Sequence, residues 1–293
     1  MSIPPAASIT KADFTKLLAQ YPILVNEISK SKGCKHPLTQ PIDKETISVN
    51  ATIAKPGQKT LEQLDKYRYG DALQQFGSKG SKAEMTHDDV KLLVEWKLRH
   101  GKFRPTLMNL VTSNDSSTTK STIKQAIQTY RAASPSSASD KPPSAAVIAA
   151  ALATLTKLRG IGPATASLLL TVHDPDRVIF FSDEAFYWLC CGGKVSPIKY
   201  NNKEYELLRE KATALVERLG VPATDVEKVA YVLMKQGAST QVKDAAEMSK
   251  PQKPTPVKAQ AAAKRKSTAS QETEKPAPES PAAGVRRSKR AKN

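Results

Sequence analysis

Two glycines and a proline near the middle of the chain form a pattern that can bind an anion through the backbone. The stretch Gly160-Ile161-Gly162-Pro163 lies between two runs of helical apolar spacing. Glycine adopts backbone angles that other residues avoid, and proline is well tolerated at the first position of a helix. The unpaired amides at such a helix start attract phosphate. We therefore expect the backbone around Gly160, Ile161, Gly162 and Thr165 to contact phosphates. The alternative is an ordinary turn between antiparallel helices.

A second group of residues, at 95–105, combines cations with aromatic rings. Lys97, Lys102 and Arg104 are interleaved with Trp96 and Phe103. Such a mixture suits a surface that faces a nucleic-acid backbone, with a ring available for stacking or wedging. We expect the three cations to contact DNA. The alternative is a solvated helix end, where cations favour the negative pole of the helix dipole.

The composition favours a polyanionic partner. The chain has 293 residues, with 45 Lys and Arg against 28 Asp and Glu, which gives a formal net charge of +17. Such an excess favours association with nucleic acid, and a merely solvated basic surface is the alternative. Three cysteines cannot supply a four-thiolate zinc or iron–sulfur site, so we predict no metal centre. No apolar run approaches the roughly 18 residues of a membrane span, so we expect no membrane contact. We expect a monomer.

Helical start and stop signals predict an all-α fold that positions these residues. Thr60, Thr86 and Ser144 each precede helical apolar spacing and are suited to cap a helix start. Thr224 to Glu227 is the cap expected for the last helix, which should end before Gly237. Strand patterns are scarce, and the one strand-like run, at 177–181, is short.

The chain divides into three parts on the same reasoning. Residues 1–59 form an N-terminal segment that is partly helical or irregular, because its helical spacing is broken by Pro22. Residues 60–236 form the all-α domain, with a Ser- and Pro-rich loop at 132–143. Residues 237–293 form a basic tail without aromatic residues, which we predict to be disordered.

The tail contains two compact basic clusters that favour a nuclear protein. They consist of Lys264, Arg265 and Lys266, followed by Arg286, Arg287, Lys289 and Arg290. Clusters of this kind are bound by nuclear import factors or attracted to phosphates, and a role in solubility alone is the alternative. We expect the protein in the nucleus.

The segment at 158–166 resembles the helix-hairpin-helix motif, and residues 152–189 resemble the DNA glycosylase superfamily that contains endonuclease III and adenine glycosylase. The resemblance implies that the hairpin clamps a DNA phosphate, often with a bound monovalent cation, and reads no base edge. It also implies that Asp183 is the catalytic aspartate, which would act on a nucleotide flipped from the duplex. The alternative for Asp183 is a helix cap, or support of the helix dipole beside a capping Ser182.

The resemblance also limits the chemistry. Bifunctional members of the superfamily use a lysine two positions after the second hairpin glycine, where this chain has Ala164. An enzyme of this kind would therefore be a monofunctional glycosylase of base-excision repair. The sequence leaves three hypotheses: a DNA-binding protein with a glycosylase-like fold and no sequence specificity, a monofunctional glycosylase that uses Asp183, and a non-enzymatic adaptor that contacts chromatin proteins.

Overall fold

Helices make up the regular secondary structure of the part of the chain that can be described. The computed structural model describes residues 3–31, 58–77, 83–132 and 143–248, which belong to one unit, Met1–Ser249. The helices in chain order are α1 (Lys11–Ser31), α3 (Leu61–Lys66), the π-helical η1 (Tyr67–Asp71), α4 (Ala72–Phe76), α5 (His87–His100), α6 (Leu107–Thr112), α7 (Ser116–Ala132), α8 (Ala145–Leu155), α9 (Pro163–His173), α10 (Asp183–Cys190), α11 (Asn202–Leu219) and α12 (Ala223–Met248). The predicted all-α class is confirmed. Within the described residues, the strand-like run at 177–181 is extended but unpaired.

The predicted helix starts are held by side-chain caps. Thr60 and Gln63 form a capping box at α3, and Thr86 forms one with Asp89 at α5. The Ser144 side chain accepts a hydrogen bond from a backbone amide of α8. Each cap satisfies amides that the first helical turn would leave without a partner. These starts confirm what the sequence predicted.

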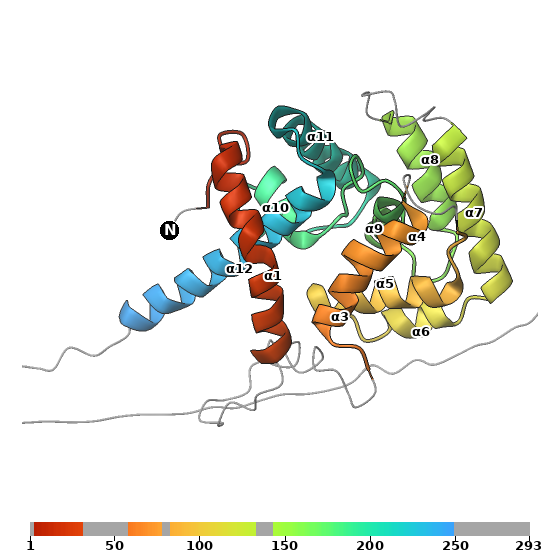
Figure 1. Cartoon of the computed structure of the whole chain (residues 1–293), viewed down its shortest axis with the longest axis horizontal. Helices are drawn as coiled ribbons and strands as arrows, with labels where there is room; N and C mark the ends of the chain where they lie inside the picture. The colour runs from red at the N-terminus through yellow and green to blue at the C-terminus, as the bar shows by residue number, and fades with distance from the viewer. Residues whose placement is uncertain (1–2, 32–57, 78–82, 133–142, 249–293) are drawn as a thin grey trace, which may run out of the picture. The chain divides into compact units, whose positions relative to one another are not determined.

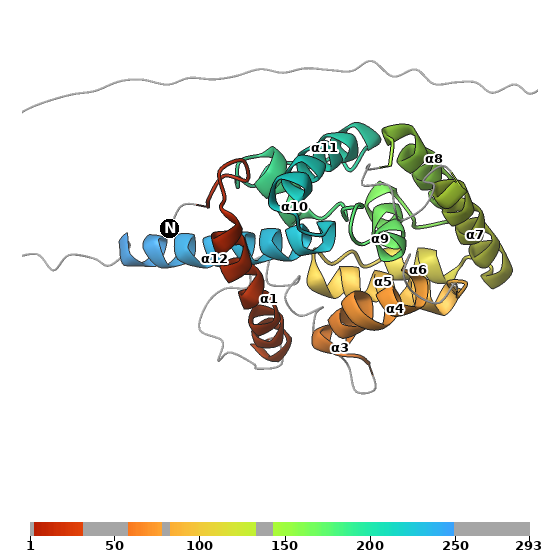
Figure 2. The ribbon, with the colours of Figure 1, turned by 45° about the horizontal axis from the view of Figure 1, so that its top comes forward.

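The first and last helices of the described chain pack against each other. Figures 1 and 2 show α1 crossing α12, while α7 and α8 lie side by side at the other end of the unit. Helix α9 lies between these two groups and contacts α4, α5, α8 and α11. It is buried along its length from Ala164 to His173. This central helix begins at Pro163, directly after Gly162.

Two stop signals in the sequence do not end a helix. Pro22 lies inside α1, which continues to Ser31 because Tyr21 and Val25 on either side of it are buried in the core. Gly237 lies inside α12, which continues to Met248. A Cβ atom at Gly237 would lie 3.1 Å from Ile3, so this glycine provides room for a neighbouring side chain. The predictions of a helix break at Pro22 and of a helix end before Gly237 were wrong.

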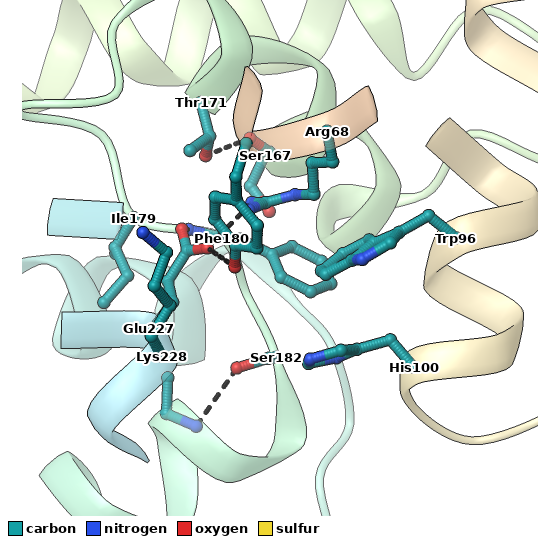
Figure 3. Close-up of polar contacts among 12 residues, drawn as sticks. Arg68, Trp96, His100, Ser167, Thr171, Ile179, Phe180, Ser182, Glu227 and Lys228 are labelled. Carbon is teal, nitrogen blue, oxygen red and sulfur yellow. Dashed lines mark hydrogen bonds and ion pairs between the residues drawn. The ribbon is translucent and has the colours of Figure 1, made fainter. Parts of the chain in front are cut away.

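A buried ion pair joins distant parts of the chain. Arg68 of η1 and Glu227 of α12 meet at 2.7 Å, and the second carboxylate oxygen of Glu227 accepts a hydrogen bond from the Phe180 amide at 2.6 Å (Figure 3). The Arg68 guanidinium also lies 4.3 Å from the centre of the Trp96 ring. Glu227 was predicted to cap α12, but its carboxylate is directed into the core.

The predicted loop at 132–143 and the basic clusters of the tail lie largely or wholly outside the described residues. This applies to all seven cations of the clusters, namely Lys264, Arg265, Lys266, Arg286, Arg287, Lys289 and Arg290.

Candidate functional site

The turn between α8 and α9, residues 156–162, has the backbone geometry that its glycines predict. Gly160 has a φ of +78°, a region that disfavours side chains, and the Ile161 amide donates to the Leu158 carbonyl at 3.1 Å. Gly162 is extended, and Pro163 takes the first position of α9. The Ile161 side chain is buried, as expected. The turn is therefore fixed at its apex and tightly joined to the core.

Asn114, which follows α6, holds the turn from outside. Its side-chain oxygen accepts a hydrogen bond from the Arg159 amide at 2.8 Å, and its side-chain nitrogen donates to the Arg159 carbonyl at 2.9 Å. The amide side chain of Asn114 thus pairs with both backbone groups of Arg159, as a neighbouring β-strand would. The sequence reasoning missed Asn114, because a partner 45 residues away leaves no local pattern.

Two amides of the turn are open. Within the described residues, the N–H groups of Gly160 and Gly162 donate to no protein acceptor. Gly162 is exposed, and a Cβ atom added there would meet nothing within 4 Å. At the start of α9 these amides lie at the positive end of the helix dipole. The turn therefore presents donors to an anion.

The open turn faces a cleft of about 240 Å³. Six of the seven residues predicted to contact DNA line it, and the predicted catalytic residue does so too: Lys97, Lys102, Arg104, Gly160, Gly162, Thr165 and Asp183. The exception is Ile161, whose side chain packs inward. Phe186 and Trp188 of α10 are buried and do not line the cleft. Three separated segments of sequence are thus brought to one site.

Lys97 reaches into the cleft from α5. Its ammonium donates a hydrogen bond to the Thr165 hydroxyl at 2.7 Å. Burial and the nearby Arg104 charge lower the pKa of Lys97 from 10.5 to about 8, against an opposing effect of Asp183. Lys102 and Arg104, by contrast, are exposed at the cleft. The cleft therefore holds one half-buried amine and two solvated cations.

Asp183 does not serve as the helix cap. The Ser182 hydroxyl takes that role by accepting a hydrogen bond from the Ala185 amide at 3.1 Å. The Asp183 carboxylate instead accepts one from the Tyr200 hydroxyl at 2.7 Å. Burial raises the pKa of Asp183, although the Tyr200 bond and the nearby cations oppose the rise. Asp183 therefore turns toward the cleft and not toward its own helix.

Tyr200 lines the cleft although no sequence pattern indicated it. It is a non-glycine residue with a φ of +54°, and the Arg104 guanidinium lies 5.1 Å from the centre of its ring. A side chain held in this backbone region is supported by its surroundings. Here the support comes from Asp183 and Arg104. A residue with positive φ that is not glycine, asparagine or aspartate leaves no signal in a single sequence.

Among the described residues, no group of three or more His, Cys, Asp or Glu side chains is placed to hold a metal ion. No described helix combines the length and the apolar character that a bilayer crossing needs. His173 is buried with its Nδ1 3.0 Å from the Phe76 carbonyl.

Comparisons with protein-family models, curated proteins and solved structures find no match to this chain.

Proposed function

We propose that this protein binds the sugar-phosphate backbone of duplex DNA through the α8–α9 turn, as a helix-hairpin-helix of the glycosylase-like kind, without reading the base sequence. The observation that carries the proposal is the pair of open amides at Gly160 and Gly162. They lie at the start of a buried helix and face a cleft that also contains cations. Backbone amides in such a position bind phosphate whatever base follows it.

The cations of the cleft support the same ligand. Lys102 and Arg104 are exposed and line the same cleft as the turn, so one anionic strand can contact the turn and both cations. The net charge of +17 adds a general attraction to a polyanion. Binding of this kind releases counterions, so the affinity should fall steeply with salt.

The turn also offers acceptors for the monovalent cation that the resemblance implies. Within the described residues, the carbonyl oxygens of Gly160 and Ile161 accept no protein hydrogen bond. Carbonyl oxygens suit a hard cation. A cation there would place positive charge beside the bound phosphate.

The test compares two variants that add the same charge in different places. Gly162→Glu puts a carboxylate into open space beside the amides, and Ile23→Glu puts one on α1 at a side chain that is 61% exposed. Fluorescence anisotropy with labelled duplexes of unrelated sequences should show similar affinity among sequences and at least a tenfold loss for Gly162→Glu. Ile23→Glu should bind almost as the native chain does.

Equal binding by the two variants would refute a phosphate site at the turn. Absence of DNA binding altogether would favour the adaptor hypothesis, in which the fold serves contacts with chromatin proteins. We also propose nuclear localisation on the basis of the two basic clusters, which a fluorescent fusion lacking residues 264–266 and 286–290 would test.

A second candidate function is a monofunctional DNA glycosylase. The specific observation in its favour is that Asp183 lines the cleft while Ser182 caps the helix. A carboxylate there could stabilise the positive charge that develops on a sugar as its base leaves. Release of a damaged base from a duplex should then disappear in Asp183→Asn, while affinity for undamaged DNA stays within a factor of two. Processing that survives Asp183→Asn would exclude this role.

A further inference from the structure

We propose that a second cavity, at the opposite end of α9 from the cleft, binds a small single-ring aromatic acid whose hydrogen-bond donor meets His173 and whose acid group meets the cations of α7. This cavity has a volume of about 160 Å³ and is lined by residues 83–85, by α7 and by His173, the last residue of α9. Its occupation does not require DNA, so the proposal is independent of the proposed function.

The first support is a buried nitrogen without a partner. His173 is 4% exposed, and its Nδ1 lies 3.0 Å from the Phe76 carbonyl oxygen. A carbonyl oxygen only accepts hydrogen bonds, so Nδ1 carries the proton and Nε2 of the neutral ring keeps a lone pair. Within the described residues, this Nε2 has no hydrogen-bond partner. A buried acceptor without a donor is destabilising, so its position at a cavity indicates a ligand that donates a hydrogen bond.

The charge state of His173 determines which part of the ligand it contacts. Burial and the nearby charge of Arg131 lower the pKa of His173 to about 4, against an opposing effect of the Phe76 carbonyl. The ring is therefore neutral near pH 7, and its Nε2 accepts a hydrogen bond from a hydroxyl or N–H group. A carboxylate oxygen carries no proton at that pH and would be repelled by the lone pair. The acid group of the ligand must therefore lie elsewhere in the cavity.

The walls of the cavity suit an aromatic ring. Met85, Ile123 and Ile127 line it, and all three are buried. A cavity of about 150 Å³ with aliphatic and aromatic walls admits a benzene ring. The volume of about 160 Å³ is therefore enough for one ring, and it is too small for a nucleotide. Apolar walls also offer few partners to a water molecule, which makes about three hydrogen bonds when buried.

The charged residues that line the cavity favour an acid. Lys120, Lys124 and Arg131 all belong to α7 and are exposed. Glu84 is the single carboxylate among the lining residues, and it pairs with Lys120 at 2.8 Å and with Lys124 at 2.6 Å. Arg131 donates a hydrogen bond at 2.9 Å to the same carbonyl that His173 contacts. A ligand whose donor meets Nε2 can therefore place its acid group beside Arg131.

The experiment uses 4-hydroxyphenylacetate as the probe, together with two analogues that each lack one feature. In 4-methoxyphenylacetate a methyl group replaces the hydroxyl hydrogen, whereas 4-methylphenol keeps the hydroxyl but has no acid group. The full chain, labelled with nitrogen-15, is titrated with each compound at pH 7 while the histidine ring nitrogens are followed by NMR. The chain has four histidines, and the signal of His173 is the one that is absent from His173→Phe.

We expect 4-hydroxyphenylacetate to shift the Nε2 signal of His173 in a saturable way. It should bind at least tenfold more tightly than 4-methoxyphenylacetate, because the methoxy analogue has no donor for Nε2. It should bind at least threefold more tightly than 4-methylphenol, because the phenol lacks the acid. This comparison uses the native chain and does not depend on any variant.

Two further variants test the contact with the acid. Arg131→Gln removes a cation that lines the cavity, and Arg209→Gln makes the same change on α11, outside the cavity. Calorimetric titration should show a loss of at least threefold in affinity for 4-hydroxyphenylacetate in Arg131→Gln and little change for 4-methylphenol. Arg209→Gln should bind both compounds as the native chain does.

A His173 signal that does not move with millimolar 4-hydroxyphenylacetate would overturn the proposal. Equal affinity for the hydroxy and methoxy acids would also overturn it, and so would equal binding by Arg131→Gln and Arg209→Gln. None of these results depends on whether the chain binds DNA, so the proposed function is tested separately.

Discussion

Gly160 and Gly162 look alike in the sequence, but the structure predicts that alanine lowers the stability of the protein strongly at Gly160 and only slightly at Gly162. At Gly160 the φ of +78° is unfavourable for any side chain, and the new Cβ would lie 3.0 Å from both Leu110 Cβ and Val111 Cγ2. The Leu110 atom is a Cβ, which no change of rotamer moves, and Val111 is completely buried. The clash must therefore be absorbed by the turn.

The magnitude follows from two contributions. A left-handed backbone costs a residue with a side chain roughly 1–2 kcal/mol, and overpacking of a core costs typically 1–3 kcal/mol. Gly160→Ala should thus lower the free energy of unfolding by about 2–5 kcal/mol. Gly162 has a φ of −87° and open space around it, so Gly162→Ala should change that free energy by less than about 1 kcal/mol.

Urea unfolding followed by circular dichroism at 222 nm measures both values, with the native chain as reference. The same proteins should then be tested for duplex binding. Gly162→Ala should retain most of its affinity, because alanine keeps the amide. If Gly160→Ala unfolded at the same urea concentration as the native chain, neither the left-handed backbone nor the close contacts at Gly160 would restrict this position.

Four other predictions follow from contacts described above. Asn114→Ala removes two hydrogen bonds to the turn and should cost about 1–2 kcal/mol of stability in urea unfolding. Arg68→Ala leaves the Glu227 carboxylate buried without its cation and should cost about 3–5 kcal/mol by the same measurement, so a loss under 1 kcal/mol would contradict the burial of the pair. Lys102→Ala should reduce the slope of log affinity against log salt by about one, measured by anisotropy. Burial lowers the pKa of His173 from 6.5 to about 4, so between these pH values the unfolded chain binds a proton that the folded chain excludes. The free energy of unfolding should therefore fall by about 3 kcal/mol as the pH drops from 6.5 to 4. Urea unfolding across that range should show this decline for the native chain and not for His173→Gln.

The parts of the fold that were predictable are those set by neighbours in the sequence. The capping box at Thr60 is formed with Gln63, three residues on, and the backbone path of the turn follows from Gly160, Gly162 and Pro163. Local chemistry of this kind acts in any fold. The all-α class and the burial of Ile161 follow from the same local patterns.

The parts that were not predictable depend on tertiary packing. Glu227 has the right spacing from Thr224 for a cap, but Arg68 binds it from 159 residues away. Gly237 resembles a helix stop until Ile3 is seen to pack against it. In each case a local preference worth about 1 kcal/mol is outweighed by burial, which is worth more.

The candidate site divides in the same way. Cations at 97–104, the turn at 160–162 and Asp183 were each identifiable from residue type, but their meeting in one cleft was not. Tyr200 and Asn114 escaped notice because their roles are contacts with Asp183 and Arg159, and nothing near them in the sequence reports those partners. Only the assembled fold shows which groups lie together.

The buried pair of Arg68 and Glu227 also constrains how the protein is made. A ribosome must add 159 residues after Arg68 before Glu227 exists, which takes about 8–30 s at typical rates of 5–20 residues per second. Until then Arg68 lacks its carboxylate partner, and the Phe180 amide, once synthesised, lacks the carboxylate that accepts its hydrogen bond. The extended segment that leads from Phe180 to Asp183 therefore gains this anchor only after the last helix has been synthesised, so the cleft that it lines is completed late in the synthesis of the chain.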